Sequence, residues 1–468
     1  MAIDSGELGI ERVPAAAYER PAAASEHPAL RRRVLGLAGP VIGENLLETM
    51  LGIVDTALVA RLGASATAGV GSAQQLMWFL ICVLSALAVG SAVLVAQAVG
   101  AGDTQHAGRL ARQSLIWSVL LSIPLALGGL LLARTVVGMY GLAPEVATIS
   151  VEYLHVTMGT VVVLVGLFIG GGVLRGAGDS RTPMRVTAIA NLVNVGLAYG
   201  LIYGHFGLPA LGAVGSAWAT FLARGLALIL LIGALWRGSN GVSIGRARSG
   251  LGGWRPEFGV ARDVLRIGVP AAMEQILIAS AFFALTIVVA RLGTETLAAH
   301  RIALNALSLS FLPGIGFGIA ATALVGQSVG ARRLGEGAAA ARFATICAIG
   351  WMGAIALVIL VFAAPIMRLF SADPTVIAAG AAGLRVVALA QPFWAILFVQ
   401  SGGLRGTGNT RFPLLVTGGG IWISVALGFL LINTLGGGLV AVWAGFLAVA
   451  PFMAALHWWR FRRAVREG

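Results

Sequence analysis

Long apolar runs alternate with short polar segments along almost the whole chain after residue 30. A helix needs about 20 apolar residues to cross a bilayer, and twelve runs reach that length. Because apolar and polar residues do not alternate within the runs, the pattern disfavours a membrane β-barrel. We therefore predict an all-α integral membrane protein with twelve transmembrane helices. The predicted spans are approximately 34–60, 66–99, 109–134, 147–175, 184–204, 210–236, 264–291, 297–330, 339–363, 376–404, 413–435 and 438–460.

The chain also repeats itself at a constant spacing of 230 residues. Six helices per repeat is an even number, so both repeats enter the membrane in the same orientation and form two pseudo-symmetric six-helix bundles. We expect a cytoplasmic tail at 1–30, an N-terminal lobe at 31–236, a flexible cytoplasmic linker at 237–262 and a C-terminal lobe at 263–468. The matched positions include Pro40 and Pro270, Glu44 and Glu274, and the Leu-Arg-Gly segments 174–176 and 404–406.

Composition and charge agree with this topology. Hydrophobic residues make up 58% of the chain and charged residues 11%, whereas charged residues approach about a quarter of a soluble domain. All 32 basic residues are Arg, and most fall on one side if the N-terminus is cytoplasmic, as the positive-inside rule requires. The net charge of +13 therefore indicates contact with anionic lipid and not with nucleic acid. We predict a multi-pass protein of the inner (plasma) membrane with both termini cytoplasmic.

Carboxylates inside spans are the first candidates for function, because a charge at bilayer depth is costly. Glu44, Glu48 and Asp55 share the first span, where Glu48 and Asp55 lie about 40° and 20° around the helix from Glu44. Such a face could hold a proton or a cation. Alternatively, the carboxylates could simply bond to neighbouring helices. Function is favoured for Asp55, the deepest acid, and both interpretations stay open for Glu44 and Glu48.

The repeat shows that these acids are not duplicated equally. Glu44 has a counterpart in Glu274, whereas Ile278 and Leu285 stand at the positions that match Glu48 and Asp55. We therefore expect the coupling chemistry in the N-terminal half. Asn191 and Asn194 lie three residues apart on one helix face, which suits a hydrogen bond to a first-helix carboxylate.

Two sets of candidate residues follow, although interhelical bonding and packing remain alternatives for most members. The first set would bind the coupling cation, and the second would line a cavity for flat organic cations, which aromatic faces attract. The cation-coupling candidates are Asp55, Glu44, Glu48, Asn194 and Asn191. The substrate-cavity candidates are Glu274, Gln275, Asn305, Trp394 and Phe283.

Several motifs resemble the multidrug and toxic compound extrusion (MATE) transporters over nearly the whole chain after the tail. The resemblance implies two six-helix lobes, a central cavity open alternately to each side, and export of organic cations in exchange for protons or sodium. The motifs are the Pro-x-x-x-Glu starts at Pro40 and Pro270, the segments 298–305 and 325–331, and the Leu-Arg-Gly-x-Gly loops at 174–178 and 404–408.

The resemblance also bears on single residues. Asp55 resembles the first-helix Asp that the DinF-like and NorM-like branches use for cation coupling, and Asn194 matches the Asn of the DinF-like site. The Asp expected four residues later is Ala198. Trp394 replaces the tenth-helix Asp of NorM-like sodium transporters, and Glu274 lies one turn before the expected seventh-helix Glu. The acids are few and spread out, which favours protons over sodium.

The leading hypothesis is thus a secondary active multidrug efflux antiporter for organic cations. The alternative is a lipid-linked oligosaccharide flippase of a related class, which would be expected to place several Arg in its cavity, whereas only Arg224 lies within a span. A Walker A loop requires a Lys, which this chain lacks, and no metal-spaced His pair or nucleophile motif predicts an enzyme. We expect a monomer in the lipid bilayer with no cofactor or metal beyond the transported H⁺ or Na⁺.

Overall fold

The protein is an assembly of long helices in a computed structural model that describes residues 28–245 and 254–467. This architecture confirms the predicted all-α fold. The first half contains α1 (Pro28–Ala60), α2 (Ala64–Gly100), α3 (Thr104–Gly138), α4 (Pro144–Gly159), α5 (Val161–Gly176), α6 (Arg181–Tyr203) and α7 (Ala213–Arg237). The second half contains α8 (Phe258–Ala290), α9 (Thr294–Gly330), α10 (Leu334–Arg368), α11 (Pro374–Gly406), α12 (Arg411–Pro413), the π-helix η5 (Leu414–Gly418), α13 (Gly419–Leu435) and α14 (Gly438–Glu467).

Eleven helical segments in the described ranges are long and apolar enough to cross a membrane, and α4 with α5 makes a twelfth if the pair is one span. The predicted fourth span is therefore broken, with a bend of 53° between α4 and α5. At the break, the Thr160 hydroxyl donates to the Val156 carbonyl oxygen at 2.7 Å, and a side chain of this kind competes with the helix for backbone partners. The matching helix α11 continues unbroken.

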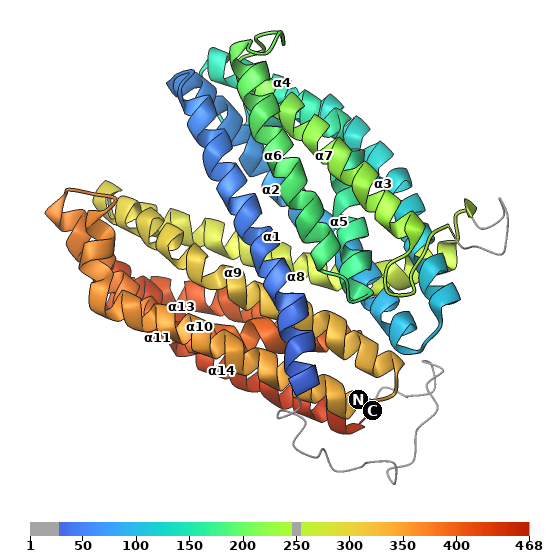
Figure 1. The fold of residues 1–468 in the computed structure, drawn as a ribbon. Coiled ribbons are helices and arrows are strands. Elements are labelled where there is room, and N and C mark those ends of the chain that lie inside the picture. The colour runs from blue at the N-terminus through green and yellow to red at the C-terminus, as the bar shows by residue number, and fades with distance from the viewer. Residues whose placement is uncertain (1–27, 246–253, 468) are drawn as a thin grey trace.

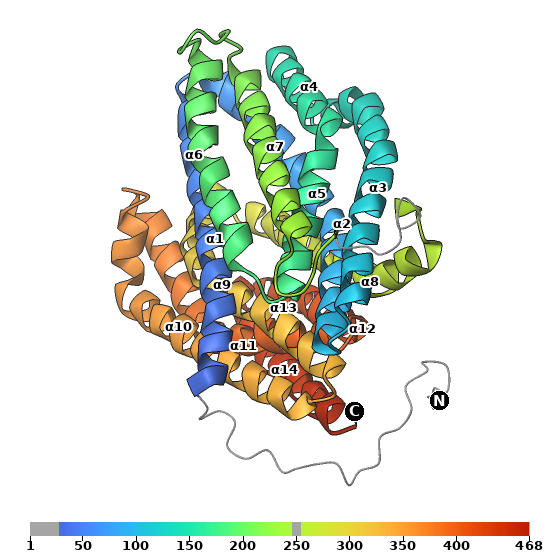
Figure 2. The same cartoon turned by 45° about the vertical axis from the view of Figure 1, so that its right-hand side comes forward.

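The helices form two bundles, α1–α7 and α8–α14, each around its own hydrophobic core. Figures 1 and 2 show that the bundles meet at the end where α1 begins and α14 ends, and diverge toward the other end. The loops at 61–63 and 291–293 lie at the diverging end. The arrangement matches the predicted pair of pseudo-symmetric lobes.

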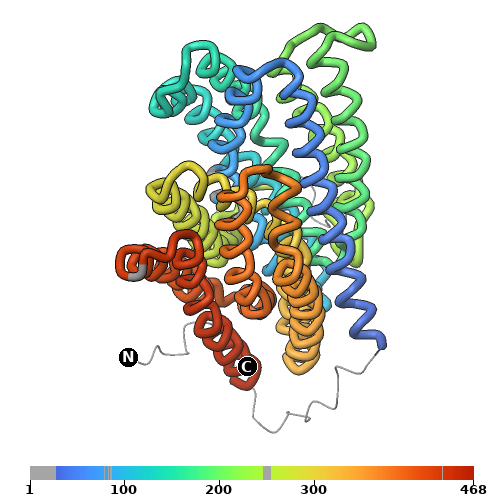
Figure 3. Tube along the Cα trace, turned by 90° about the vertical axis from the view of Figure 1, so that its left-hand side faces the viewer, coloured from blue at the N-terminus to red at the C-terminus, as the bar shows by residue number. Residues whose placement is uncertain are grey.

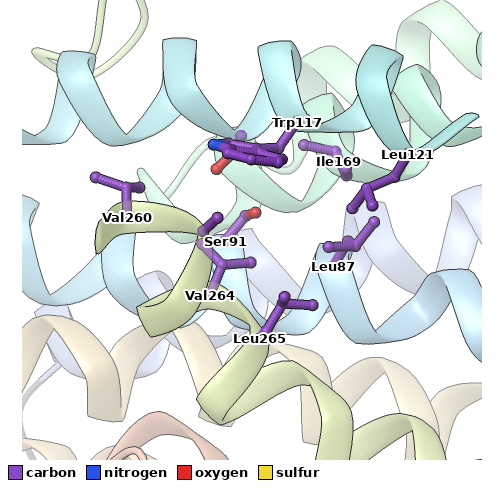
Figure 4. A pocket seen from close by; sticks show the side chains of 10 residues that line it. Leu87, Ser91, Trp117, Leu121, Ile169, Val260, Val264 and Leu265 are labelled. Carbon is purple, nitrogen blue, oxygen red and sulfur yellow. The ribbon is translucent and has the colours of Figure 1, made fainter. Parts of the chain in front are cut away.

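The first helix of each half begins in the core of the other bundle. Val34, Leu37 and Ala38 of α1 pack in the C-terminal core, and Figure 3 shows the first turns of α1 beside the light-orange trace of the second half. Conversely, Val260 and Val264 of α8 pack in the N-terminal core. Figure 4 shows the latter pair at a small pocket whose other lining residues include Ser91 and Trp117. The lobes are therefore interlocked, which the division at residues 31 and 263 did not anticipate.

The described parts of the linker are bonded to the N-terminal bundle at both ends. After α7, the Ser239 hydroxyl donates to Asp179 Oδ2 at 2.6 Å. Before α8, the Gln113 side chain donates to the Arg255 carbonyl at 2.7 Å and accepts from the Glu257 N–H at 2.9 Å. Residues 246–253, in the middle of the predicted linker, and residues 1–27 of the predicted tail lie outside the described residues.

Candidate functional site

Asp55 is a buried acid on an otherwise exposed stretch of α1. Its side chain is only 7% exposed, whereas residues 52–54, 56 and 57 are exposed. The Ser216 hydroxyl of α7 lies 2.7 Å from Oδ1 and 2.9 Å from Oδ2. A hydroxyl has one hydrogen, so Ser216 donates to the two oxygens in alternation or shares its hydrogen between them. The carboxylate therefore retains acceptor capacity toward a cation or a proton.

Helix α7 presents three polar residues to this site at intervals of four. Ser216, Thr220 and Arg224 lie on one helix face because residues four apart are neighbours on the surface of a helix. Thr220 accepts a hydrogen bond from Asn194 Nδ2 at 3.2 Å. The Arg224 guanidinium interacts electrostatically with Asp55. Helix α7 thus brings together the acid of α1 and the amide of α6.

Tyr153 of α4 also belongs to this site. Its side chain is 4% exposed, and its hydroxyl lies next to Gln74 of α2 and Ser216 of α7. Five helices of the N-terminal bundle therefore contribute to one polar cluster, which we call the Asp55 cluster: Asp55, Gln74, Tyr153, Asn194, Ser216, Thr220 and Arg224.

The charges of the Asp55 cluster determine what it can bind. A carboxylate in a low-dielectric environment is unstable without polar partners or a counter-charge. Here the Ser216 hydroxyl contacts Asp55, and the positive charge of Arg224 acts on the carboxylate electrostatically without a direct contact. In the part of the chain that the structure describes, no group of three His, Cys, Asp or Glu side chains is placed to hold a metal ion.

Glu44 and Glu274 lie outside the Asp55 cluster, each in a salt bridge. Arg175 Nη1 is 3.1 Å from both oxygens of Glu44, and Arg405 Nη2 is 2.8 Å from Glu274 Oε2. The two bridges are equivalent under the repeat and tie α1 to α5 and α8 to α11. The Glu274 side chain is 1% exposed, so its carboxylate is engaged by Arg405 and is not on an open cavity surface.

The two remaining cation-coupling candidates, one on α1 and one on α6, are also separated from Asp55. Glu48 is exposed, and Asn191 Nδ2 donates to the Leu47 carbonyl oxygen at 2.8 Å, which ties α6 to α1. Although the three acids share a face of α1, that face meets α5 at Glu44 and α7 at Asp55. The predicted acidic stripe therefore does not form one site.

The five predicted substrate-cavity residues do not share one environment. Trp394 is buried at 7% exposure and packs edge-on against Phe311 and Phe446. Phe283 and Asn305 are exposed and Gln275 is half-buried. Together with the buried Glu274, these positions do not converge on a described pocket.

Sequence reasoning missed Ser216, Thr220 and Tyr153. A signal existed for the first two, because a Ser-Thr-Arg series at intervals of four is unusual on an apolar helix and marks one polar face. Periodicity alone could not show that this face of α7 contacts Asp55 of α1. Tyr153 carried no comparable signal.

Comparisons with known proteins agree over nearly the whole chain. The family model MatE matches residues 40–200 and again residues 270–430, the same spacing as the internal repeat. The chain is 32% identical over 439 residues to a probable multidrug resistance protein NorM of Thermotoga maritima, covering 92% of each. It is 29% identical to the multidrug resistance protein PmpM of Pseudomonas aeruginosa, covering 85% of this chain and 83% of that protein.

Solved structures share the fold. One described as an outward-facing conformation of a multidrug resistance MATE family transporter superposes with a TM-score of 0.85 at 22% identity, covering 96% of this chain and 98% of that chain. A transporter of the MOP superfamily from Pyrococcus furiosus superposes equally well, also at a TM-score of 0.85 and 22% identity.

Proposed function

We propose that this chain, which belongs to the MATE family of transporters, is a secondary active multidrug exporter that moves small organic cations out of the cell in exchange for protons bound at Asp55. The names of its relatives support the multidrug part of this proposal. The geometry around Asp55 supports the coupling part. With both termini in the cytoplasm, the diverging end of the bundles is the external side, where protons enter.

The observation that carries the choice of ion is that the Asp55 cluster contains a single carboxylate. A proton needs only one carboxylate, whereas a dehydrated sodium ion needs several oxygen ligands, and the position that could add a second carboxylate, one turn after Asn194, is Ala198. The Ser216 hydroxyl can bond to either form of the Asp55 carboxyl group.

In the proposed cycle, protonation neutralises Asp55 and changes the net charge of the N-terminal bundle. Because the Ser216 hydroxyl joins Asp55 of α1 to α7, neutralising the carboxylate alters how these two helices pack. The organic cation leaves on the external side, and deprotonation toward the cytoplasm restores the charged carboxylate.

The test is transport of ethidium in proteoliposomes with either a pH gradient or a sodium gradient. Asp55→Asn keeps the size and the hydrogen-bonding ability of the side chain but cannot take up a proton, so we expect ion-driven transport to fall to background. Glu48→Gln is the matched control, since Glu48 is on the same helix but exposed. Undiminished transport by Asp55→Asn removes Asp55 from the mechanism. Transport by the wild type that requires sodium contradicts proton coupling.

A further inference from the structure

Two glutamines join the bundles by the same hydrogen bond made in opposite directions. Gln97 Nε2 of α2 donates to the Gly406 carbonyl oxygen at the end of α11, at 3.1 Å. Gln327 Nε2 of α9 donates to the Gly176 carbonyl oxygen at the end of α5, at 2.9 Å. Both donors and both acceptors are related by the 230-residue repeat. Each bond therefore connects one half of the chain to the other.

The two carbonyl oxygens that accept these bonds are well placed to bond to the opposite bundle. Gly176 and Gly406 are the last residues of their helices, where carbonyl oxygens have no intrahelical partner and carry the negative end of the helix dipole. An amide N–H satisfies such a carbonyl without a charge. Gln327 is held further by Arg33 of α1, whose Nη2 donates to Gln327 Oε1 at 3.1 Å.

The backbones of α2 and α9 approach closely at the same level. A Cβ added at Gly100 would lie 1.9 Å from the Gln327 carbonyl oxygen, and one added at Gly330 would lie 1.8 Å from the Gln97 carbonyl oxygen. Real side chains cannot be this close, so the contact requires glycine at both positions. The two glycines are again a pair under the repeat.

We infer that Gln97 and Gln327, the glutamine pair, hold the bundles together at the end where α1 begins and α14 ends, and that both bonds break each time the transporter opens at that end. This inference rests on the proposed alternating access but not on the choice of ion or substrate. Hydrogen bonds between uncharged groups suit a contact of this kind, because they hold one state with modest strength and reform without ion uptake. The symmetry means that opening breaks both bonds together.

The test measures the separation of the diverging ends without transport. Spin labels are attached at Arg61→Cys and Arg291→Cys, which are equivalent positions on the two bundles, in a background with Cys82→Ala and Cys347→Ala. Double electron–electron resonance then gives the distance distribution. Gln97→Met and Gln327→Met preserve side-chain length but cannot donate the bonds. We expect the shorter-distance population to rise by about fivefold relative to the longer one for each bond lost, with the larger shift in the double variant.

Gln105→Met is the matched control, because Gln105 is an exposed residue at the start of α3 near the same end of the molecule. We expect it to leave the distances unchanged. A double variant of the glutamine pair with the wild-type distribution overturns the inference.

A second pair of variants tests the close backbone contact between α2 and α9. Gly100→Ala and Gly330→Ala each place a methyl group against a carbonyl of the other bundle and should shift the distances in the same direction. Gly335→Ala, whose added Cβ would meet nothing within 4 Å, should not. Because the readout needs no gradient or substrate, failure of the Asp55 hypothesis and failure of this one are distinguishable.

Discussion

Glu274 and Arg405 form the more deeply buried of two equivalent salt bridges. Exposure of the Glu274 side chain is 1%, compared with 18% for Glu44 in the first half. Removing one partner of a buried pair leaves an uncompensated charge, which costs about 3 kcal/mol. We expect Glu274→Gln to lower the thermal unfolding midpoint in detergent more than Glu44→Gln does. Equal losses would show that burial does not set the strength of these bridges.

Asp179, in the loop between α5 and α6, gives a prediction about pH. Burial raises the pKa of its carboxyl group, but hydrogen bonds from the Ser239 and Thr182 hydroxyls and from two backbone N–H groups lower it below the ordinary value of 3.8. A lowered pKa stabilises the folded protein above the unfolded-state value, and this contribution is lost as the pH falls through the folded-state value.

The difference in unfolding stability between the wild type and Asp179→Asn should therefore be largest at pH 6 and should decrease as the pH falls below about 4. Thermal unfolding in detergent between pH 6 and pH 3 measures it. A constant difference over this range would contradict the assignment of the hydrogen bonds to the ionised carboxylate.

At the scale of elements, Gln113 bonds to the backbone immediately before α8. Its buried side chain accepts from the N–H of Glu257, the residue before the helix, and donates to the Arg255 carbonyl. Gln113→Leu leaves both backbone groups without these partners, at a cost of about 1–3 kcal/mol for each group that stays buried. We expect faster hydrogen exchange at residues 257–261, whereas the exposed control Gln105→Leu should leave exchange there unchanged.

Several elements show the limit of what the sequence could predict. The repeat predicted the topology because matched prolines, arginines and glycines recur at one spacing. The break at Thr160 was not predictable, because its counterpart in the second half lies within an unbroken α11. Asp55 was identified as an acid within a span. Its contact with Ser216 of α7 depends on how the two helices cross, which the periodicity of the sequence does not reveal. The same limitation concealed the salt bridges of Glu44 and Glu274.

At the scale of the whole molecule, the orientation in the membrane is open to direct measurement. With both termini cytoplasmic, Arg61→Cys should react with a membrane-impermeant maleimide added outside intact cells. Arg333→Cys, in the loop between α9 and α10, should react only after the membrane is permeabilised. The background again carries Cys82→Ala and Cys347→Ala, and the opposite labelling pattern would invert the proposed orientation.

The exchanged starts of α1 and α8 have a consequence for the origin of the chain. A protein of half this length could not complete its own core, because the turn that contains Val34 and Leu37 packs in the other bundle, as does the turn that contains Val260 and Val264. Two copies of such a protein would complete each other by swapping these turns. Gene fusion would then have joined an existing domain-swapped dimer without creating a new interface, and afterwards each half was free to diverge. Asp55 and its counterpart Leu285 are one position at which the two halves now differ.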